Sequence, residues 1–252
     1  MQYFVLHYPK QPERKIALLK QFEEYNIENV TWVEDLNKDD PFIAWVKEKT
    51  KSEMPLGHVS ANVKHYKILY DIVQNNIEEA IIFEDDVVFD PEFRKLNFDI
   101  FPRELGFLRL GIGVHLKYSE KMYSAENFVT ITNPGGCECY WMTKRFAKLF
   151  IEYANFDFSM DMVQMGFMGT VVNKPMRLLP VCYQTSIFNS ETSETGTCSD
   201  VHWMDYCSKF LELENYSFPS LWKEYHTPVE PKPSSPRSVC STYGVSSTSA
   251  TV

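Results

Sequence analysis

The sequence predicts an α/β fold: a nucleotide-binding sheet flanked by helices. Two observations carry this prediction. Short apolar runs rich in β-branched and aromatic residues alternate with longer segments whose apolar residues recur at helical spacing. One of these runs, residues 80–83, is apolar without interruption, which is typical of a central strand buried on both faces.

The N-terminal part of the chain has the order expected of a parallel βαβ unit, followed by a second helix and the central strand. The spacing predicts a strand over residues 1–8, a helix over 13–25, a strand over 30–33 and a helix over 60–73. Residues 39–53 are polar and contain Pro41, so we expect a variable excursion there.

The second half of the chain predicts shorter elements. We expect strands over residues 106–111, 128–132 and 176–182, and a helix over 141–153. From residue 227 the composition changes to Pro, Ser and Thr with almost no apolar residues to bury. We therefore expect one domain over residues 1–226 and a disordered tail over 227–252.

Length and charge restrict the function. The chain has 252 residues, of which 44% are hydrophobic, so it can bury a sizeable core. Its formal net charge of −9 would repel a phosphate backbone, which disfavours nucleic acid as the main partner. An anionic small molecule would need a local cationic patch or a bound metal ion.

The sequence also predicts a cellular location. The N-terminus shows no secretory signal, and no stretch approaches the roughly 20 apolar residues that span a bilayer. We expect a cytoplasmic protein of bacterial or viral origin, and peripheral contact with a membrane stays open. The six cysteines are expected to be free thiols, and no second close pair joins Cys137 and Cys139 in a zinc set.

The acidic triplet Glu84-Asp85-Asp86 lies between two apolar runs, directly after the predicted central strand. Three ionised acids in poorly solvated surroundings are costly, and a divalent cation such as Mg²⁺ or Mn²⁺ removes that cost. Such a cation could bridge to the diphosphate of a nucleotide. Ligand sites of open α/β sheets lie beyond the carboxyl ends of strands, as this triplet does. A solvated turn of acids is the alternative interpretation.

Two segments around this triplet resemble glycosyltransferase family 25, which includes bacterial lipooligosaccharide sugar transferases and collagen galactosyltransferases. In that family a G-x-x-G-C-x-x-S-H segment leads through a helix into a strand that ends E-D-D. Gly57, His65 and the E-D-D triplet match this pattern. Residues 60, 61 and 64 depart from it, since Ser, Ala and Lys stand where the family usually has Gly, Cys and Ser.

Three further segments are similar to the family in the same order, so the resemblance spans roughly residues 3–190. Val5-Leu6-His7 followed by Arg14 resembles the family's opening I-N-L strand and its Arg, with His7 in place of Asn. Residues 136–149 resemble a segment in which a small residue and a Tyr precede a helix. Asp161 stands where the family has an Asp after that helix.

The resemblance implies a GT-A-like fold and a hexosyltransferase. The donor would be a UDP-sugar, with galactose or glucose as the sugar, and the acceptor a glycan or glycosylated protein. The metal would be Mn²⁺ or Mg²⁺. Asp86 and Asp85 would be its first ligands, with Glu84 as a third ligand or as a hydrogen-bond acceptor in the sheet. The cation would stabilise charge on the departing diphosphate.

The resemblance also suggests roles for other residues. His65 would fix the acidic loop or contact the donor, and Arg14 would contact donor phosphate. Asp161 would take a proton from the acceptor hydroxyl. A satisfied helix histidine, a surface arginine and an exposed helix acid are the respective alternatives, and Asp157 competes with Asp161. Residues 184–197 lie where many transferases hold a lid, and a plain polar connector is the alternative. His202 is a further candidate metal ligand on its residue type alone.

Two other functions stay open at this point. A phosphoryl or nucleotidyl transferase also uses paired acids, but the chain shows no glycine-rich phosphate loop. A degenerate transferase domain could act as a glycan- or partner-binding module. The departures at His7, Ser60, Ala61 and Lys64 keep this second alternative open.

Overall fold

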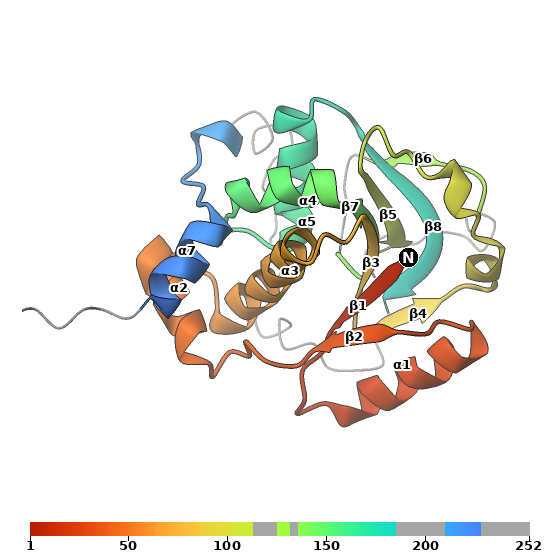
Figure 1. The fold of residues 1–252 in the computed structure, drawn as a ribbon, viewed down its shortest axis with the longest axis horizontal. Coiled ribbons are helices and arrows are strands. Elements are labelled where there is room, and N and C mark those ends of the chain that lie inside the picture. Colours follow the sequence, from red (N-terminus) through yellow and green to blue (C-terminus); the bar gives the residue numbers. More distant parts are fainter. Residues whose placement is uncertain (113–124, 132–135, 185–209, 228–252) are drawn as a thin grey trace, which may run out of the picture.

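A mixed β-sheet lies between two layers of helices (Figure 1). The computed structural model of the chain describes residues 1–112, 125–131, 136–184 and 210–227. The strands in these ranges are β1 (Gln2–Leu6), β2 (Val30–Val33), β3 (Glu79–Glu84), β4 (Val87–Phe89), β5 (Phe107–Ile112), β6 (Val129–Ile131), β7 (Cys139–Thr143) and β8 (Met176–Gln184). They form one sheet in the order β2-β1-β3-β7-β5-β8-β4, with β6 beside β8.

The helices divide between the two faces of the sheet. The α-helices are α1 (Pro12–Glu24), α2 (Pro41–Thr50), α3 (Leu56–Gln74), α4 (Lys144–Phe150), α5 (Met160–Gly166) and α7 (Phe218–His226). Short helical turns are η1 (Pro91–Lys95), η2 (Phe98–Ile100), η4 (Ile151–Tyr153), η5 (Phe167–Val171) and η6 (Phe210–Glu212). Helices α2, α3, α4, α5 and α7 pack into the core on one face, and α1 and η1 into the core on the other.

Strand β3 is buried on both faces, as the sequence predicts. Ala80 and Ile82 belong to the core beneath α3, whereas Ile81 and Phe83 belong to the core beneath α1. All four side chains are fully buried. Because successive side chains of a strand point to opposite faces, an uninterrupted apolar run is what a strand between two helical layers requires.

The order in which successive strands are added to the sheet reverses at β1. Strand β1 pairs in parallel with β2 on one side and with β3 on the other, so that Leu6 stands opposite both Val33 and Glu84. The first crossover, through α1, leads to β2, and the second, through α2 and α3, leads back across β1 to β3. Ligand sites of open α/β sheets lie at such a reversal, outside the carboxyl ends of the strands.

The prediction of a variable excursion over residues 39–53 is wrong, because α2 occupies most of it. Pro41 stands in the first helical turn, where proline is favoured, and the Asp40 carboxylate accepts a 2.8 Å hydrogen bond from the Phe42 amide. Phe42, Ile43 and Val46 are buried. The proline that we took for a loop signal therefore marks the start of a helix.

The prediction of a helix over residues 141–153 is correct only for its second part. Trp141 lies in β7, where it stands opposite Ile81 of β3 in an antiparallel pair. Helix α4 begins at Lys144, and the Thr143 hydroxyl accepts from the Phe146 amide at 3.3 Å. A short apolar run does not by itself distinguish a doubly buried strand from a buried helix, and here β7 completes the sheet beside β3.

The other predicted elements are confirmed within one to four residues: β1, α1, β2, α3, β5, β6 and β8. Residues 228–252 of the tail predicted over 227–252, the greater part of the predicted lid and His202 lie outside the described residues. Within the described ranges, helices are too short or too polar to cross a bilayer.

Candidate functional site

The acidic triplet lies at the reversal point of the sheet. Glu84 ends β3, Asp85 and Asp86 form the turn that leads to β4, and His7 follows β1. Because β1 and β3 are parallel neighbours, their carboxyl ends meet at the same edge. The end of β1, with His7, and the acidic triplet after β3 are therefore brought together here, although they lie far apart in the sequence.

Asp85 is held by groups of the protein itself. Its Oδ2 lies 2.7 Å from His7 Nδ1 and accepts from the Tyr8 amide at 3.0 Å, and its Oδ1 accepts from Arg14 Nη1 at 2.7 Å. Burial raises the pKa of Asp85, but the bonds from His7 and Arg14 outweigh burial and hold this pKa below its usual value. Asp85 is thus an ionised anchor with its charge already compensated.

Asp86 is held quite differently. Its Oδ2 accepts from Gln184 Nε2 at 3.1 Å and lies 3.6 Å from Arg14 Nη1, whereas its buried Oδ1 has no hydrogen-bond partner. Burial, followed by the charge of Glu84, raises the pKa of Asp86 to about 7. A buried carboxylate oxygen beside a second carboxylate is short of positive charge, and a hard divalent cation would supply it.

Glu84 is oriented by a buried histidine. His65, on α3, is fully buried, and its Nε2 lies 3.3 Å from Oε1 of Glu84. Its Nδ1 lies 2.8 Å from the Tyr140 hydroxyl, which comes from β7. The Glu84 side chain remains 27% exposed, so it can reach a ligand from solvent while His65 holds one oxygen. His65 thus contacts the acidic triplet, and its role in fixing the acidic loop stays a prediction.

Cys137 joins this group from the approach to β7. One ligand atom each of His65, Glu84 and Cys137 lies within 4.8 Å of the other two. The nearness of Cys137 to His65 and Glu84 is not predicted from the sequence. The three residues come from different elements, and only the pairing of β3 with β7 brings them together.

Asp161 lies at the same edge of the sheet. It stands in the first turn of α5, is half-buried, and its Oδ2 accepts from the Gly136 amide at 2.9 Å. Burial raises the pKa of the Cys137 thiol, and the charges of Glu84 and Asp161 both add to this shift, so both acids lie near Cys137. Burial lowers the pKa of His58 and the charge of Asp161 opposes this effect, so His58 is a further neighbour.

Two departures from the family pattern have a structural function. The Lys64 ammonium donates to the His7 carbonyl at 2.6 Å and to Asn37 Oδ1 at 2.7 Å. The Ser60 hydroxyl donates to the Leu36 carbonyl at 2.7 Å. Both side chains therefore tie α3 to the segments that follow β1 and β2.

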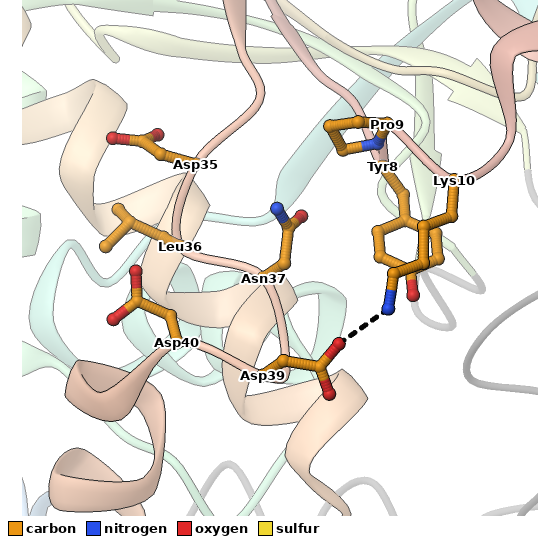
Figure 2. A pocket seen from close by; sticks show the side chains of 8 residues that line it. All are labelled: Tyr8, Pro9, Lys10, Asp35, Leu36, Asn37, Asp39 and Asp40. Atoms are coloured by element: carbon orange, nitrogen blue, oxygen red, sulfur yellow. Dashed lines mark hydrogen bonds and ion pairs between the residues drawn. The ribbon is translucent and has the colours of Figure 1, made fainter.

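A pocket opens where β1 and β2 end (Figure 2). It has a volume of about 290 Å³ and is lined by Tyr8, Pro9, Lys10, Asp35, Leu36, Asn37, Asp39 and Asp40. Figure 2 shows Lys10 facing Asp39, and the two form a 2.7 Å ion pair. Tyr8 links the pocket to the triplet, because it lines the pocket and its amide donates to Asp85. Its carboxylates and amide suit a ligand rich in hydroxyl groups.

Glu138, which directly precedes β7, is a further candidate that is not predicted from the sequence. Its side chain is fully buried, and neither carboxylate oxygen has a hydrogen-bond partner. A fully buried acid without a partner is a frequent mark of function. The signal in the sequence was an acid inside the apolar run of residues 137–142, which we attributed to the resemblance alone.

Comparisons with known proteins identify one matching family and one similar solved structure. A family model described as glycosyltransferase family 25 (LPS biosynthesis protein) matches residues 1–164. A solved structure described as a glycosyltransferase involved in the glycosylation of the major capsid of PBCV-1 is similar with 9% identity and a TM-score of 0.38, over 84% of this chain and 100% of that chain. A comparison with curated proteins finds no match.

Proposed function

The chain belongs to glycosyltransferase family 25, and from this premise we propose that it moves a hexose from a UDP-sugar to a hydroxyl group in a metal-dependent reaction. Galactose or glucose is the proposed hexose. The observation that carries the metal dependence is the buried Oδ1 of Asp86, which has no hydrogen-bond partner and lies in the field of Glu84.

Asp86 and Glu84 would hold the cation. Their carboxylate oxygens are hard ligands, which suit Mn²⁺ or Mg²⁺. When bound, the cation stabilises negative charge on the departing diphosphate. We assign Asp85 to orientation rather than to direct coordination, because its two oxygens already accept from His7, Tyr8 and Arg14. Arg14 then supports the turn, and it contributes positive charge close to Asp86.

The pocket at the ends of β1 and β2 would receive the nucleoside of the donor. Asp35, Asp39 and Asp40 would repel phosphate but can accept hydrogen bonds from ribose hydroxyls. A donor lying this way would place its diphosphate toward Asp86, since Tyr8 separates the pocket from the acidic turn. The reversal of the sheet at β1 supports this orientation, because nucleotides bind at such points.

Asp161 would act as the base on the acceptor side. One oxygen of its carboxylate accepts from the Gly136 amide, and the other would face the acceptor. Asp161 lies at the same edge of the sheet as Glu84. It would take the proton of the attacking hydroxyl. The acceptor would be a glycan or a protein hydroxyl, and the family's description as an LPS biosynthesis protein favours a glycan of that class.

A donor screen tests this proposal. The protein is incubated with Mn²⁺, a set of lipooligosaccharide and simple glycan acceptors, and one UDP-sugar at a time, and UDP release is measured. We expect release with one donor, loss of release with EDTA and recovery with excess Mn²⁺. Asp86→Ala should abolish release, whereas Asp99→Ala, which changes an exposed acid in η2, should not.

Two results would count against the proposal. Release that survives EDTA and Asp86→Ala would contradict metal dependence. Silence with every donor and acceptor, from a protein whose melting is cooperative, would favour the alternative of a transferase domain that only binds glycans or partners.

A further inference from the structure

His65, Glu84 and Cys137 bring three different metal-binding groups together. One ligand atom of each lies within 4.8 Å of the other two, and Nε2 of His65 lies 3.3 Å from Oε1 of Glu84. An imidazole nitrogen, a carboxylate oxygen and a cysteine sulfur are the side-chain ligands that bind Zn²⁺ in proteins. Two ligand atoms of one tetrahedral Zn²⁺ lie roughly 3.5 Å apart. Small side-chain shifts would therefore close this group around one cation.

The backbone holds Cys137 at this position. The amide of the preceding residue, Gly136, donates to Oδ2 of Asp161 at 2.9 Å. The carbonyl of the following residue, Glu138, accepts from the Glu84 amide at 2.8 Å, which continues the antiparallel pairing of β3 with β7. Cys137 therefore lies between two anchored residues, close to the end of β3, and is itself buried.

The ring of His65 is oriented by a second contact. Its Nδ1 lies 2.8 Å from the Tyr140 hydroxyl, so that Nε2 is the nitrogen that faces Glu84. A hydrogen bond at the second ring nitrogen is the usual device that fixes the ring of a metal-binding histidine. His65 and Tyr140 are both fully buried, so this orientation is set by the packing of α3 against β7.

Glu84 gives access to the group from solvent. Its side chain is 27% exposed, whereas His65 and Cys137 are buried. An ion would reach the buried pair past Glu84, and a coordination position would remain on that side for water or another ligand. Three protein ligands with one open position are typical of zinc sites that act on a bound molecule, whereas structural zinc sites use four protein ligands.

The chemical class of these ligands differs from that of the acidic turn. Asp86 offers a carboxylate, which suits Mg²⁺ or Mn²⁺, whereas a thiolate and an imidazole favour Zn²⁺ and related ions. The side chains of His65 and Cys137 come from α3 and from the segment before β7, and Asp86 comes from the turn after β3. Two neighbouring groups of ligands thus have different cation preferences, and Glu84 lies between them in the chain and in chemistry.

We propose that His65, Glu84 and Cys137 bind a thiophilic divalent cation of the Zn²⁺ class, at a site distinct from the Mn²⁺ or Mg²⁺ site proposed at Asp86. Binding forms a bond between the metal and Sγ of Cys137, and the thiol proton passes to solvent. The site uses Cys137 without Cys139, so it differs from the paired-cysteine zinc set that the sequence excludes. The inference goes beyond the proposed function, because it concerns another class of cation and needs no sugar donor.

Co²⁺ is the probe, because it replaces Zn²⁺ at such sites and absorbs light when a thiolate binds it. Absorption spectra are recorded in reducing buffer during Co²⁺ titration of the wild type, Cys137→Ser and Cys139→Ser. Cys139 is the matched control, because it is also buried but belongs to the core beneath α1, whereas Cys137 belongs to the core beneath α3. The wild type and Cys139→Ser should develop the near-ultraviolet charge-transfer band from sulfur to cobalt, and Cys137→Ser should lose it. Added Zn²⁺ should remove the band from the wild type.

A second readout is the Zn²⁺ affinity, measured by competition with a coloured chelator. Loss of an outer partner of a metal ligand already weakens binding about 10-fold. Loss of a ligand itself, in Cys137→Ser or Glu84→Gln, should therefore weaken Zn²⁺ binding at least ~10-fold, and Cys139→Ser should leave it unchanged. The melting temperature in EDTA shows whether each variant folds. If Cys137→Ser does not fold, Cys137→Ala is titrated instead, because its small apolar side chain suits a buried position.

The outcomes distinguish the inference from the proposed function. A wild type without the charge-transfer band, or a band that Cys137→Ser retains or that both variants lose equally, would overturn the inference. Mn²⁺ binding that depends on Asp86 would then leave the proposed function intact. If the band depends on Cys137 but the protein binds no Mn²⁺, with or without UDP, the inference stands and the proposed metal-dependent reaction falls.

Discussion

His7 Nδ1 lies 2.7 Å from Oδ2 of Asp85, and this buried pair joins the end of β1 to the turn after β3. The two residues are 78 positions apart in the sequence. At the position of His7 the family pattern has Asn, which could also donate one side-chain hydrogen bond to this carboxylate. The departure at His7 is therefore compatible with a working site, because Asp85 keeps its donor.

Asp85→Ala should destabilise the protein. The substitution removes the 2.7 Å partner of Arg14, whose side chain is only 7% exposed, and leaves it the more distant Asp86 carboxylate at 3.6 Å. Removing one partner of a buried ion pair costs about 3–5 kcal/mol in the free energy of unfolding. Urea denaturation measures the loss. Asp39→Ala, which removes an exposed partner of Lys10, is the control and should unfold like the wild type. Equal midpoints for both variants would contradict the anchoring role.

The stability of the metal-free protein should depend on pH through Asp86. The pKa of Asp86 rises from its usual 3.8 to about 7 in the folded chain, so the folded state binds this proton more tightly than the unfolded state. Protonated Asp86 therefore contributes favourably to the free energy of unfolding at low pH. This contribution, of up to ~4 kcal/mol, is lost as the pH rises from about 4 through 7. Asp85 acts in the opposite direction, since its lowered pKa gives stability that is lost on acidification.

Asp86→Asn removes this dependence and so isolates it. Urea denaturation in EDTA at several values between pH 5 and pH 8 should show that the stability of the variant relative to the wild type increases as the pH rises. Added Mn²⁺ should restore the stability of the wild type above pH 7, because the ion then takes the place of the proton on Asp86. A difference between the two proteins that stays constant with pH would show that Asp86 titrates normally.

Tyr140→Phe should weaken metal binding without removing any ligand. The hydroxyl lies 2.8 Å from His65 Nδ1, and His65 in turn contacts Glu84. Loss of such an outer partner reduces metal affinity about 10- to 100-fold, and a buried unsatisfied group costs about 1–3 kcal/mol. Calorimetric titration with Mn²⁺ provides the affinity. Tyr66→Phe is the matched control, because the Tyr66 hydroxyl is equally buried but accepts from the Asn155 amide; its Mn²⁺ affinity should stay unchanged.

Asp161→Asn should keep donor binding while transfer falls by about 10²-fold or more, the range for a general base. The amide can still accept from the Gly136 amide through its oxygen, so the local structure should persist. Initial rates and UDP affinity are measured separately. Asp157→Asn serves as the control, since Asp157 is an exposed acid nearby. An unchanged rate for Asp161→Asn, or an equal loss in both variants, would exclude Asp161 as the base.

The sequence was sufficient for the parts of the fold that local pattern determines. The run of residues 80–83 predicted the central strand, and the acids that follow it predicted where the site lies. Helix α2 was missed because Pro41 was taken as a break rather than as a first-turn residue. Strand β7 was missed because its burial on both faces depends on its neighbours β3 and β5.

The partners within the site could not be predicted in the same way. Nothing local distinguishes Asp85, which the protein compensates, from Asp86, which it does not, because the difference arises from Arg14, His7 and Gln184 in remote segments. Glu138 was missed for the same reason, since only the pairing of β7 with β3 places it beside Glu84.

Mn²⁺ affinity measured with and without UDP, on the wild type and on Asp86→Asn above pH 7, tests the central claim most directly. We predict that the wild type binds Mn²⁺, that UDP tightens this binding because ion and diphosphate meet at the same site, and that Asp86→Asn loses both effects. Equal Mn²⁺ affinity in the two proteins, with no influence of UDP, would contradict the account.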